Sequence, residues 1–511
     1  MKLCLYLQRR FAPIGHEIAR TLKHTYGVEE FCAYVELRSS FDYLCAQKDV
    51  PYTKLILEEE IIRGATDEDL DIAYLESLER KYGVPNLWPF INHDRVIRYN
   101  LLVHSYPTDR SSYTRDDMLK ILQRVARSLE KFLDEEKPDA IFFSAVTGMG
   151  SYLLYEMAKK RGITLLCLYN PRFGERYALT DDYFHYASLD EATRKMHSKE
   201  KANESLRAQA AKYLHEFQNN PVYYLEASGG ATGFTRTPTG RAAHFRFLAS
   251  PASVVRSIKW LFRSFYIYFA NPHRSDYTTI QPLSELLDKI TRRLRVLRGY
   301  RDLYTTPDPR APFAYFPLHH EPEALPMLLA PNYAFEQIWT IKQIARALPV
   351  SYTLYVKDHP VMVGRRPRTY YTELLKIPNV KLVDPAASSL GLIESSKIVF
   401  TISGTAGMEA ALLKKPAVVF SDVFYGRLPN VVRCDSVEKL PQEIASALAE
   451  DHYDEEATID FIAAIFKESV FVDLTKLWTV QGSHMSIEEK RELEPLADLI
   501  AHRLQLRHVS Q

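Results

Sequence analysis

Two apolar segments, each running into a loop and then a helix, constrain the fold of this chain most strongly. The first apolar run, Tyr352 to Val356, ends in a loop that contains His359 and Pro360. The second run, Lys397 to Ile402, leads into a turn of small residues and then a helix. A buried strand followed by a loop and a helix is the repeating unit of a parallel α/β sheet. The sequence therefore predicts a doubly wound α/β fold in this part of the chain.

The turn after the second strand has the composition of an anion-binding loop. Its residues are Ser403, Gly404, Thr405, Ala406 and Gly407, and Glu409 follows in the first turn of the expected helix. Backbone N–H groups at the beginning of a helix are free to bind a phosphate, and the helix dipole adds positive potential. We interpret this turn and the loop of His359 as a nucleotide-sugar site, with Glu409 near the ribose hydroxyls. The alternative is a plain tight turn in which Ser403 is the helix N-cap.

Strands and helices alternate in two separate blocks of the chain. A length of 511 residues indicates more than one domain. We expect a Rossmann-like acceptor-side domain over residues 1–187, a helical insertion over 188–305, a Rossmann-like nucleotide-sugar-binding domain over 306–450 and helices over 451–511 that pack back on the domains. Two such halves have the outline of a GT-B glycosyltransferase, although a fold alone does not define a function.

Composition narrows the class of protein further. Lys and Arg number 65 against 64 Asp and Glu, a net charge of +1, so no overall attraction to nucleic acid is expected. The five cysteines are scattered and show no CxxC spacing, which is typical of reduced thiols in a cytoplasmic protein. No segment approaches the roughly 20 apolar residues of a membrane span. We expect a cytoplasmic protein, at most peripheral to the inner face of the cytoplasmic membrane, with no nucleic-acid partner and no metal site.

The expected insertion contains one stretch that suggests a membrane contact. Residues 253–269 are strongly aromatic, and Arg256, Lys259 and Arg263 recur among them at helical spacing. Basic residues on one face and aromatic residues on the other suit a helix at a lipid surface. A packed interdomain helix with its basic residues toward water is an equal alternative. The basic run from Arg292 to Arg298 is interpreted as a solvated face, and the Gly- and Thr-rich stretch 228–240 as a loop.

Several motifs occur in the order found in a known protein family. They are Ala314 to Glu323, Lys357 to Pro360, Ser403 to Ala410 and Lys415 to Phe420. Together they resemble the capsule polysaccharide biosynthesis family, whose characterised members include Kdo transferases of the GT-B type. The resemblance covers residues 312–430. It implies a glycosyltransferase that moves Kdo or a related acidic sugar from a CMP-linked donor to a capsule polysaccharide or glycolipid acceptor.

The resemblance also implies roles for individual residues. His359 would contact the donor phosphate and support catalysis, Ser403, Gly404 and Thr405 would complete the anion site, and Glu409 would lie near the ribose. The family's Gln-Pro-Glu motif appears here as Glu321-Pro322-Glu323, which places Glu321, Glu323 and Lys357 among the candidate substrate-binding residues. GT-B enzymes generally neutralise the leaving phosphate with protein groups. We therefore expect metal independence and no cofactor beyond the nucleotide-sugar co-substrate.

The acceptor side should come from the N-terminal half, since a cleft between two domains needs residues from both. Ser144 begins a second glycine-containing turn after a strand, and Arg172 follows the next strand, where it could bind an anionic sugar or phosphate. Glu175 is our candidate general base, which must lie within hydrogen-bond reach of an acceptor hydroxyl. The alternatives are other carboxylates that follow strands: Asp181, Asp182 and Glu58 to Glu60.

Two other classes of function fit the same motifs. A polyol-phosphate transferase of the teichoic-acid type and a nucleotide-sugar epimerase also combine a His-Pro loop with a Ser/Gly phosphate turn. A non-catalytic scaffold in a polysaccharide synthesis or export complex would carry a degenerate site. Release of CMP from a CMP-linked sugar, from CDP-glycerol or from neither donor separates these possibilities.

Overall fold

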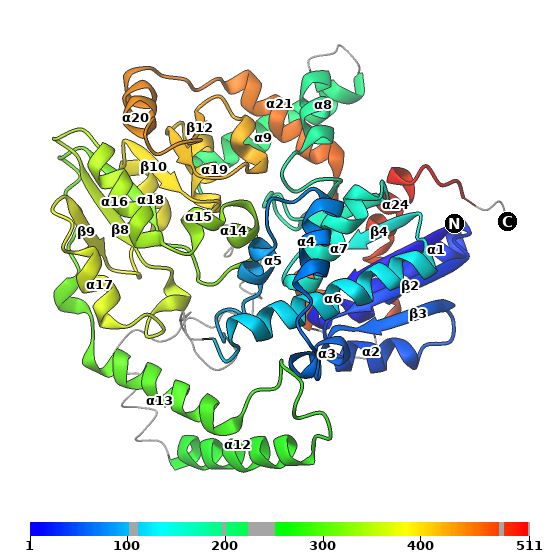
Figure 1. Ribbon diagram of the computed structural model, residues 1–511. Helices are drawn as coiled ribbons and strands as arrows, with labels where there is room; N and C mark the ends of the chain where they lie inside the picture. Colours follow the sequence, from blue (N-terminus) through cyan, green and yellow to red (C-terminus); the bar gives the residue numbers. More distant parts are fainter. Residues whose placement is uncertain (102–110, 197–200, 223–250, 480–484, 509–511) are drawn as a thin grey trace.

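The computed structural model describes residues 1–101, 111–196, 201–222, 251–479 and 485–508, and the stretch 228–240 lies outside them. It contains two Rossmann-like α/β domains with a helical insertion between them in the sequence (Figure 1). The expected fold class is therefore confirmed. Over the described residues, no helix is both long and apolar enough to cross a membrane.

The first sheet has seven strands in the order β13-β6-β5-β4-β1-β2-β3. They are β1 (Lys2–Leu7), β2 (Glu30–Val35), β3 (Tyr52–Leu57), β4 (Ala140–Phe143), β5 (Thr164–Tyr169), β6 (Arg176–Thr180) and β13 (Ser469–Phe471). The strands β1 to β5 are parallel, and β6 is antiparallel to both of its neighbours. Alternate residues of β1 enter different apolar clusters, Cys4 and Tyr6 on one face and Leu3 and Leu5 on the other, so both faces are covered.

Helices cover both faces of this sheet. They are α1 (Ala12–Tyr26), α2 (Arg38–Cys45), α3 (Glu58–Ile62), α4 (Ile72–Tyr82), α5 (Trp88–His93), α6 (Arg115–Glu136) and α7 (Met149–Lys160). The sequence predicts α4 from residue 68, but it begins at Ile72 because the Asp71 side chain caps it, accepting a hydrogen bond of 2.9 Å from the Tyr74 N–H.

The second sheet has six parallel strands in the order β12-β11-β10-β7-β8-β9. They are β7 (Phe313–Pro317), β8 (Thr353–Lys357), β9 (Val380–Val383), β10 (Ile398–Thr401), β11 (Ala417–Val419) and β12 (Val431–Arg433). The helices are α14 (Ala324–Leu329), α15 (Pro331–Ala334), α16 (Gln337–Ala347), α17 (Arg368–Leu374), α18 (Ser389–Ser395), α19 (Thr405–Leu412) and α20 (Leu440–Ala449). Because β10, β7 and β8 are neighbours, the loops at their carboxyl ends meet at one edge of the sheet.

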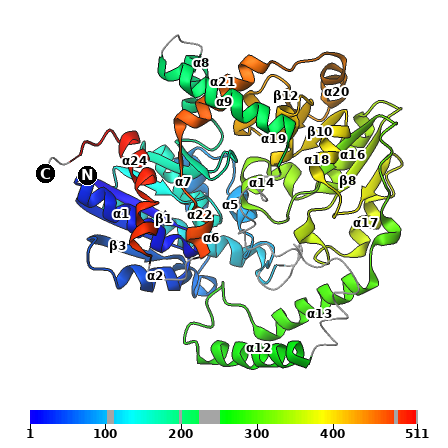
Figure 2. The same cartoon turned by 180° about the vertical axis from the view of Figure 1, so that it is seen from behind.

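The described part of the insertion is mainly helical, with turns between its helices. The helices α8 (Ala187–Met196) and α9 (Lys201–Asn219) pack against α21 (Glu455–Glu468). The helices α12 (Pro251–Ala270) and α13 (Pro282–Arg298) lie side by side and apart from the two sheets, at the bottom of both views (Figures 1 and 2).

The end of the chain returns to the first domain. After α21 come β13, α22 (Leu474–Thr479), α23 (Ile487–Arg491) and α24 (Glu494–Arg503). The sequence predicts a single helix from 487 to 504, but the structure divides it, and Pro495 stands in the first turn of α24. The helix α24 packs on α1.

Candidate functional site

A cavity of about 1060 Å³ lies between the two domains and is lined by residues of both. The predicted site residues that line it are Ser144, Arg172, Glu323, Lys357, His359, Pro360, Ser403, Gly404, Thr405, Ala406 and Glu409. Those of the C-terminal domain come from the adjoining loops and helix ends that follow β7, β8 and β10. The structure thus brings most of the predicted residues to one place, at the sheet edge where parallel α/β folds bind ligands. Their roles remain predictions.

His359 stands at the end of β8 with its hydrogen-bonding state defined by its neighbours. Its Nδ1 accepts a hydrogen bond of 3.3 Å from the Val361 N–H, so the neutral ring carries its proton on Nε2. Burial, together with the positive charges of Arg366 and Lys357, lowers the pKa of His359 to about 4. At neutral pH the side chain is therefore an uncharged hydrogen-bond donor that lines the cavity.

Asp358 and Arg366 hold the loop of His359 in place through buried polar contacts. Asp358 is 1% exposed, and its Oδ1 accepts a hydrogen bond of 2.8 Å from the His359 N–H. The same carboxylate forms an ion pair with Arg366 and accepts a hydrogen bond from the Tyr371 hydroxyl. Arg366 is fully buried, and its Nη2 also donates to the His319 carbonyl oxygen at 2.7 Å. The sequence interpretation missed Arg366, because it lies in a run of basic residues that is typical of a solvent-exposed segment.

The turn after β10 is built against a neutral histidine from the loop after β7. The Nε2 of His319 accepts a hydrogen bond of 3.1 Å from the Ile402 N–H and lies 3.1 Å from Thr401 Oγ1. Burial first, and then the charges of His359 and Arg366, lowers the pKa of His319 to about 3, so it stays neutral. A Cβ on Gly404 would lie 2.7 Å from Thr401 Oγ1 and 2.9 Å from His319 Cε1. Glycine is required at 404 by this close approach.

Gly407 supports this turn without lining the cavity. A Cβ at this position would come within 2.8 Å of the Tyr425 hydroxyl, which donates a hydrogen bond to the Gly404 carbonyl oxygen. Gly407 therefore makes room for Tyr425, and its nucleotide-binding role stays a prediction.

At the turn after β10 and the start of α19, the buried atoms Ser403 Oγ and Glu409 Oε2 have no hydrogen-bond partner among the described residues. The other carboxylate oxygen of Glu409 is 3.4 Å from Thr405 Oγ1. Burial raises the pKa of Glu409 to about 7. Unsatisfied buried polar groups are costly and rare in folded proteins, so their occurrence at one turn indicates a site that a polar ligand completes.

Glu321 does not line this cavity. It is buried, and its carboxylate accepts hydrogen bonds from Arg366 at 2.9 and 3.2 Å and another from Gln337. A carboxylate engaged in this way holds the loop after β7 in place, and a role of Glu321 in substrate binding stays a prediction.

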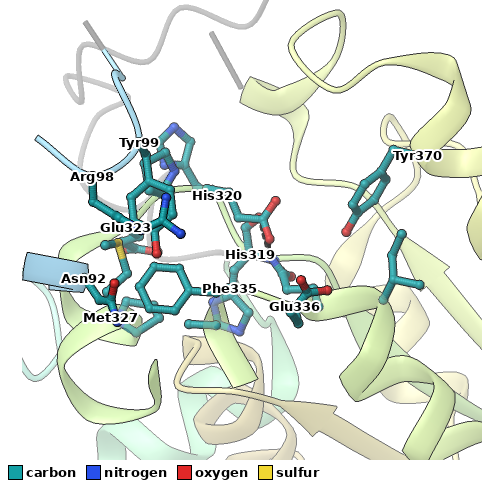
Figure 3. A pocket seen from close by; sticks show the side chains of 16 residues that line it. Asn92, Arg98, Tyr99, His319, His320, Glu323, Met327, Phe335, Glu336 and Tyr370 are labelled. Atoms are coloured by element: carbon teal, nitrogen blue, oxygen red, sulfur yellow. Dashed lines mark hydrogen bonds between the residues drawn. The ribbon is translucent and has the colours of Figure 1, made fainter. Parts of the chain in front are cut away.

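A smaller cavity of about 420 Å³ adjoins the first and shares His319, His320 and Glu323 with it (Figure 3). Glu321 lines this second space. It also includes a contact between the domains, since the rings of Tyr99 and Phe335 stack with their centroids 5.1 Å apart. The neighbouring space could hold part of a substrate that extends beyond the main cavity.

The N-terminal wall of the main cavity is positively charged. Arg10, Arg95 and Arg172 line it, and Glu323 reaches it from the other domain. Arg95 and Arg172 are the positive charges that act on the Glu323 carboxylate. Ser144 lines the same wall, and its Oγ accepts a hydrogen bond of 3.0 Å from the Gln8 N–H. Arg10 and Arg95 were not identified from the sequence, because neither belongs to a recognisable motif.

Glu175 lies outside the residues that line the cavity. Its backbone oxygen accepts a hydrogen bond of 2.9 Å from the Val472 N–H, where the returning chain joins the first sheet. A carboxylate closer to the cavity is Glu36, which accepts hydrogen bonds of 2.6 Å from Thr147 and 2.5 Å from Tyr6. Thr147 lines the cavity. The sequence predicts a strand through residue 37, so Glu36 was not considered among the carboxylates that follow strands. In the structure β2 ends at Val35, and Glu36 follows it directly.

Among the described residues, no three His, Cys, Asp or Glu side chains converge as a metal site would require. Metal independence stays a prediction. The fold and this site define a two-domain α/β protein with a polar pocket between its domains.

Comparison with known proteins agrees with the resemblance seen in the sequence. The family described as "Capsule polysaccharide biosynthesis protein" matches residues 334–427. This segment contains both the loop of His359 and the turn that begins at Ser403, so the predicted resemblance is confirmed there. No curated protein matches the chain.

Solved structures show distant likeness only. The Thermosulfurimonas dismutans KpsC beta Kdo 2,7 transferase is 10% identical, with a TM-score of 0.35, over 72% of this chain and 89% of that chain. The beta Kdo 2,4 transferase of the same protein is 11% identical, with a TM-score of 0.34, over 67% and 88%. A UDP-GlcNAc 2-epimerase from Neisseria meningitidis is 12% identical, with a TM-score of 0.27, over 92% and 99%. At these TM-scores the likenesses carry no argument about function.

Proposed function

We propose that this protein is a GT-B glycosyltransferase of capsule or surface polysaccharide synthesis. It transfers a sugar, Kdo or a related acidic sugar, from a CMP-linked donor to a polysaccharide or lipid-linked acceptor. The family match over 334–427 supports this assignment, because the matched segment carries the two loops at the donor side of the cavity. The CMP linkage and the acidic sugar come from the family resemblance.

The single observation that carries the proposal is the arrangement around the turn at 403–405. The buried oxygens of Ser403 and Glu409 lack partners among the described residues, and His359 presents an N–H donor to the same cavity. A nucleotide fits these groups: its phosphate would bind the His359 Nε2–H and the N-terminus of α19, and its ribose hydroxyls would bind Glu409. Donors already in position stabilise the charge that develops on the departing phosphate.

The opposite wall suits an acidic substrate. Arg10, Arg95 and Arg172 line the cavity on the acceptor side; Glu323 lines it beside them, and the carboxylates of Glu36 and Asp94 also act on Arg95. Guanidinium groups bind carboxylates and phosphates in a bidentate way. We assign this wall to a carboxylate of the donor sugar or to an anionic group of the acceptor.

No cofactor or metal is part of the proposal, and neither is nucleic acid. The protein would act in the cytoplasm, in contact with the inner face of the cytoplasmic membrane through residues 253–269.

The test is a thermal-shift panel with CMP, CDP, UDP, GDP and the corresponding sugar nucleotides. A ligand at about 100 times its Kd adds roughly 2.7 kcal/mol to the free energy of unfolding. We expect stabilisation by CMP and CMP-Kdo, and slow release of CMP from CMP-Kdo in the absence of acceptor.

Other outcomes would redirect the assignment. Stabilisation by UDP or GDP alone would overturn the CMP-linked donor, and CMP release from CDP-glycerol would favour a polyol-phosphate transferase. No shift and no hydrolysis with any donor would overturn the site and favour a scaffold.

A further inference from the structure

The helix α12 exposes a continuous apolar stripe. Val255, Ile258, Phe262, Tyr266 and Phe269 recur every three or four residues and therefore lie along one side of the helix. Each of them is between 49% and 74% exposed. Single exposed apolar residues are common, but a row of them along about four turns marks an interaction surface.

The neighbouring helix α13 repeats the pattern. Leu283, Leu287, Ile290 and Leu294 are spaced by four, three and four residues, and each is between 44% and 61% exposed. The sequence interpretation considered only the basic run from Arg292 to Arg298 in this helix, as a solvated face. The structure shows a second apolar stripe that remains open beside the first.

The helical hairpin formed by α12 and α13 differs sharply in charge from the rest of the chain. Residues 251–298 contain nine Lys and Arg against three Asp and Glu, a formal charge of +6 in a chain whose total is +1, so the remainder carries −5. Aromatic side chains are interleaved with this charge, and Lys289 Nζ lies 3.4 Å from the centre of the Trp260 ring. Basic and aromatic residues around an apolar stripe are the composition of segments that lie at an anionic membrane surface.

Polar contacts fasten the hairpin to both domains. Between α12 and α13, buried Asp276 forms ion pairs with Arg38 and Arg63 of the N-terminal domain. At the end of α13, Arg295 donates a hydrogen bond to the Arg365 carbonyl oxygen of the C-terminal domain. The helices that carry the apolar stripes are therefore anchored to both domains. A partner that binds the stripes also fixes the orientation of the two domains.

We propose that α12 and α13 together form a docking platform for an anionic lipid bilayer. Both stripes enter the interface between headgroups and acyl chains, and the basic residues contact anionic headgroups. The proposal goes beyond the single-helix contact by including α13 and by specifying the lipid charge. A second copy of the chain fits less well, because two hairpins of +6 would repel one another.

The experiment is vesicle sedimentation of the full-length protein with phosphatidylcholine alone and with phosphatidylcholine mixed with phosphatidylglycerol. We expect at least about tenfold stronger partitioning onto the mixed vesicles. Phe262→Ser/Tyr266→Ser on α12 and Leu287→Ser/Leu294→Ser on α13 should each reduce it about tenfold. Lys259→Gln/Arg263→Gln should reduce binding to mixed vesicles alone. Ile487→Ser, an exposed apolar residue on α23, is the matched control and should bind as the wild type does.

Trp260, one of four tryptophans, gives an independent readout in a protein whose other three are replaced by Phe. Its emission should shift to the blue on mixed vesicles and stay unchanged in the α12 and α13 variants. Equal binding to both lipids would overturn the anionic specificity. Full binding by the α13 variant would overturn the two-helix platform. Dimerisation in sedimentation velocity, lost in the same variants, would assign the stripes to a second copy instead.

This test is separate from that of the proposed function. The platform variants should keep the wild-type thermal shift with CMP and the wild-type rate of donor hydrolysis. A loss of vesicle binding with intact hydrolysis therefore concerns the platform, and a loss of hydrolysis in His359→Ala with intact vesicle binding concerns the site.

Discussion

At the scale of single residues, burial shifts the pKa values of two groups on the donor side of the cavity toward their uncharged forms. His359 has a pKa lowered to about 4, and Glu409 has a pKa raised to about 7, both chiefly by burial. A neutral imidazole donates one hydrogen bond from Nε2 and brings no desolvated charge of its own. The site can thus hold a nucleotide phosphate without first breaking an internal ion pair of either residue.

We expect His359→Ala to reduce turnover by about 10²- to 10³-fold, the usual cost of removing one hydrogen-bond donor to a developing charge. The free energy of unfolding should change by less than about 1 kcal/mol, because the ring accepts only one hydrogen bond, from Val361. Steady-state kinetics and urea denaturation measure the two effects. His185→Ala, on an exposed histidine, is the control. A wild-type rate in His359→Ala would remove this residue from the mechanism.

Glu409→Gln should change the pH dependence of stability. Between its ordinary pKa of 4.5 and its folded pKa of about 7, the carboxyl binds a proton in the folded state and not in the unfolded state. The wild type therefore loses stability as the pH rises through this window, and the full loss of stability is reached above it. The glutamine side chain does not titrate. The free energy of unfolding of the variant, relative to that of the wild type, should therefore rise by up to the order of 3 kcal/mol between about pH 4.5 and about pH 8.

Urea denaturation across this pH range measures the difference, with Glu488→Gln on the exposed helix α23 as the control. A stability difference that does not vary with pH would show that Glu409 is ionised throughout.

At the scale of elements, one arginine holds the loops after β7 and β8 together. Arg366 pairs with Asp358 beside the His359 loop and with Glu321 in the loop after β7, and all three side chains are buried. Its position explains why two loops distant in the sequence keep a common geometry. A buried ion pair of this kind adds little net stability, but it is costly to break.

Arg366→Met should therefore lower the free energy of unfolding by about 3–5 kcal/mol, because it leaves two buried carboxylates without their counter-charge. Arg368→Met is the matched control. Arg368 lies two residues from Arg366, and its replacement removes a solvent-exposed pair with Asp302, which should cost far less stability than Arg366→Met. Urea denaturation compares the two variants. Equal costs would mean that Asp358 and Glu321 are protonated or hydrated once the arginine is gone.

At the scale of the whole molecule, the last part of the chain ties the domains together. The helix α21 packs against the insertion helices α8 and α9, and β13 and α24 then complete the first domain. Leu496 and Ile500 of α24 are fully buried in the apolar cluster that includes α1. The first domain is therefore assembled from both ends of the chain.

Leu496→Ala/Ile500→Ala should destabilise the first domain by at least about 4 kcal/mol, since each large-to-small change in a core costs about 2–5 kcal/mol. We expect urea denaturation to become biphasic, with the first domain unfolding early and the second at the wild-type midpoint. Glu494→Ala, on the exposed side of the same helix, is the control. A single transition that moves as a whole would show that the two domains unfold as one unit.

Much of the fold follows from local pattern alone. The alternation of strand and helix predicted two α/β domains, because a short apolar run bounded by turn residues has few ways to be buried other than as a strand of a parallel sheet. The same logic placed the loop of His359 and the turn at Ser403 at the carboxyl ends of strands. Both motifs then line one cavity.

Other features depend on residues that meet only in three dimensions. Glu321 pairs with Arg366 across 45 positions of the sequence, and β13 pairs with β6 across nearly 300. At such separations the spacing of residues in the sequence carries no information about contact. Glu175 was chosen because it follows a strand, but the returning chain occupies its edge of the sheet, whereas Glu36 lies beside the cavity-lining Thr147. The amino-acid sequence by itself determined the strand–loop–helix units and the residues at their ends. Only the tertiary structure decided which charges are paired inside and which apolar stripes stay open, because burial is a property of the assembled chain.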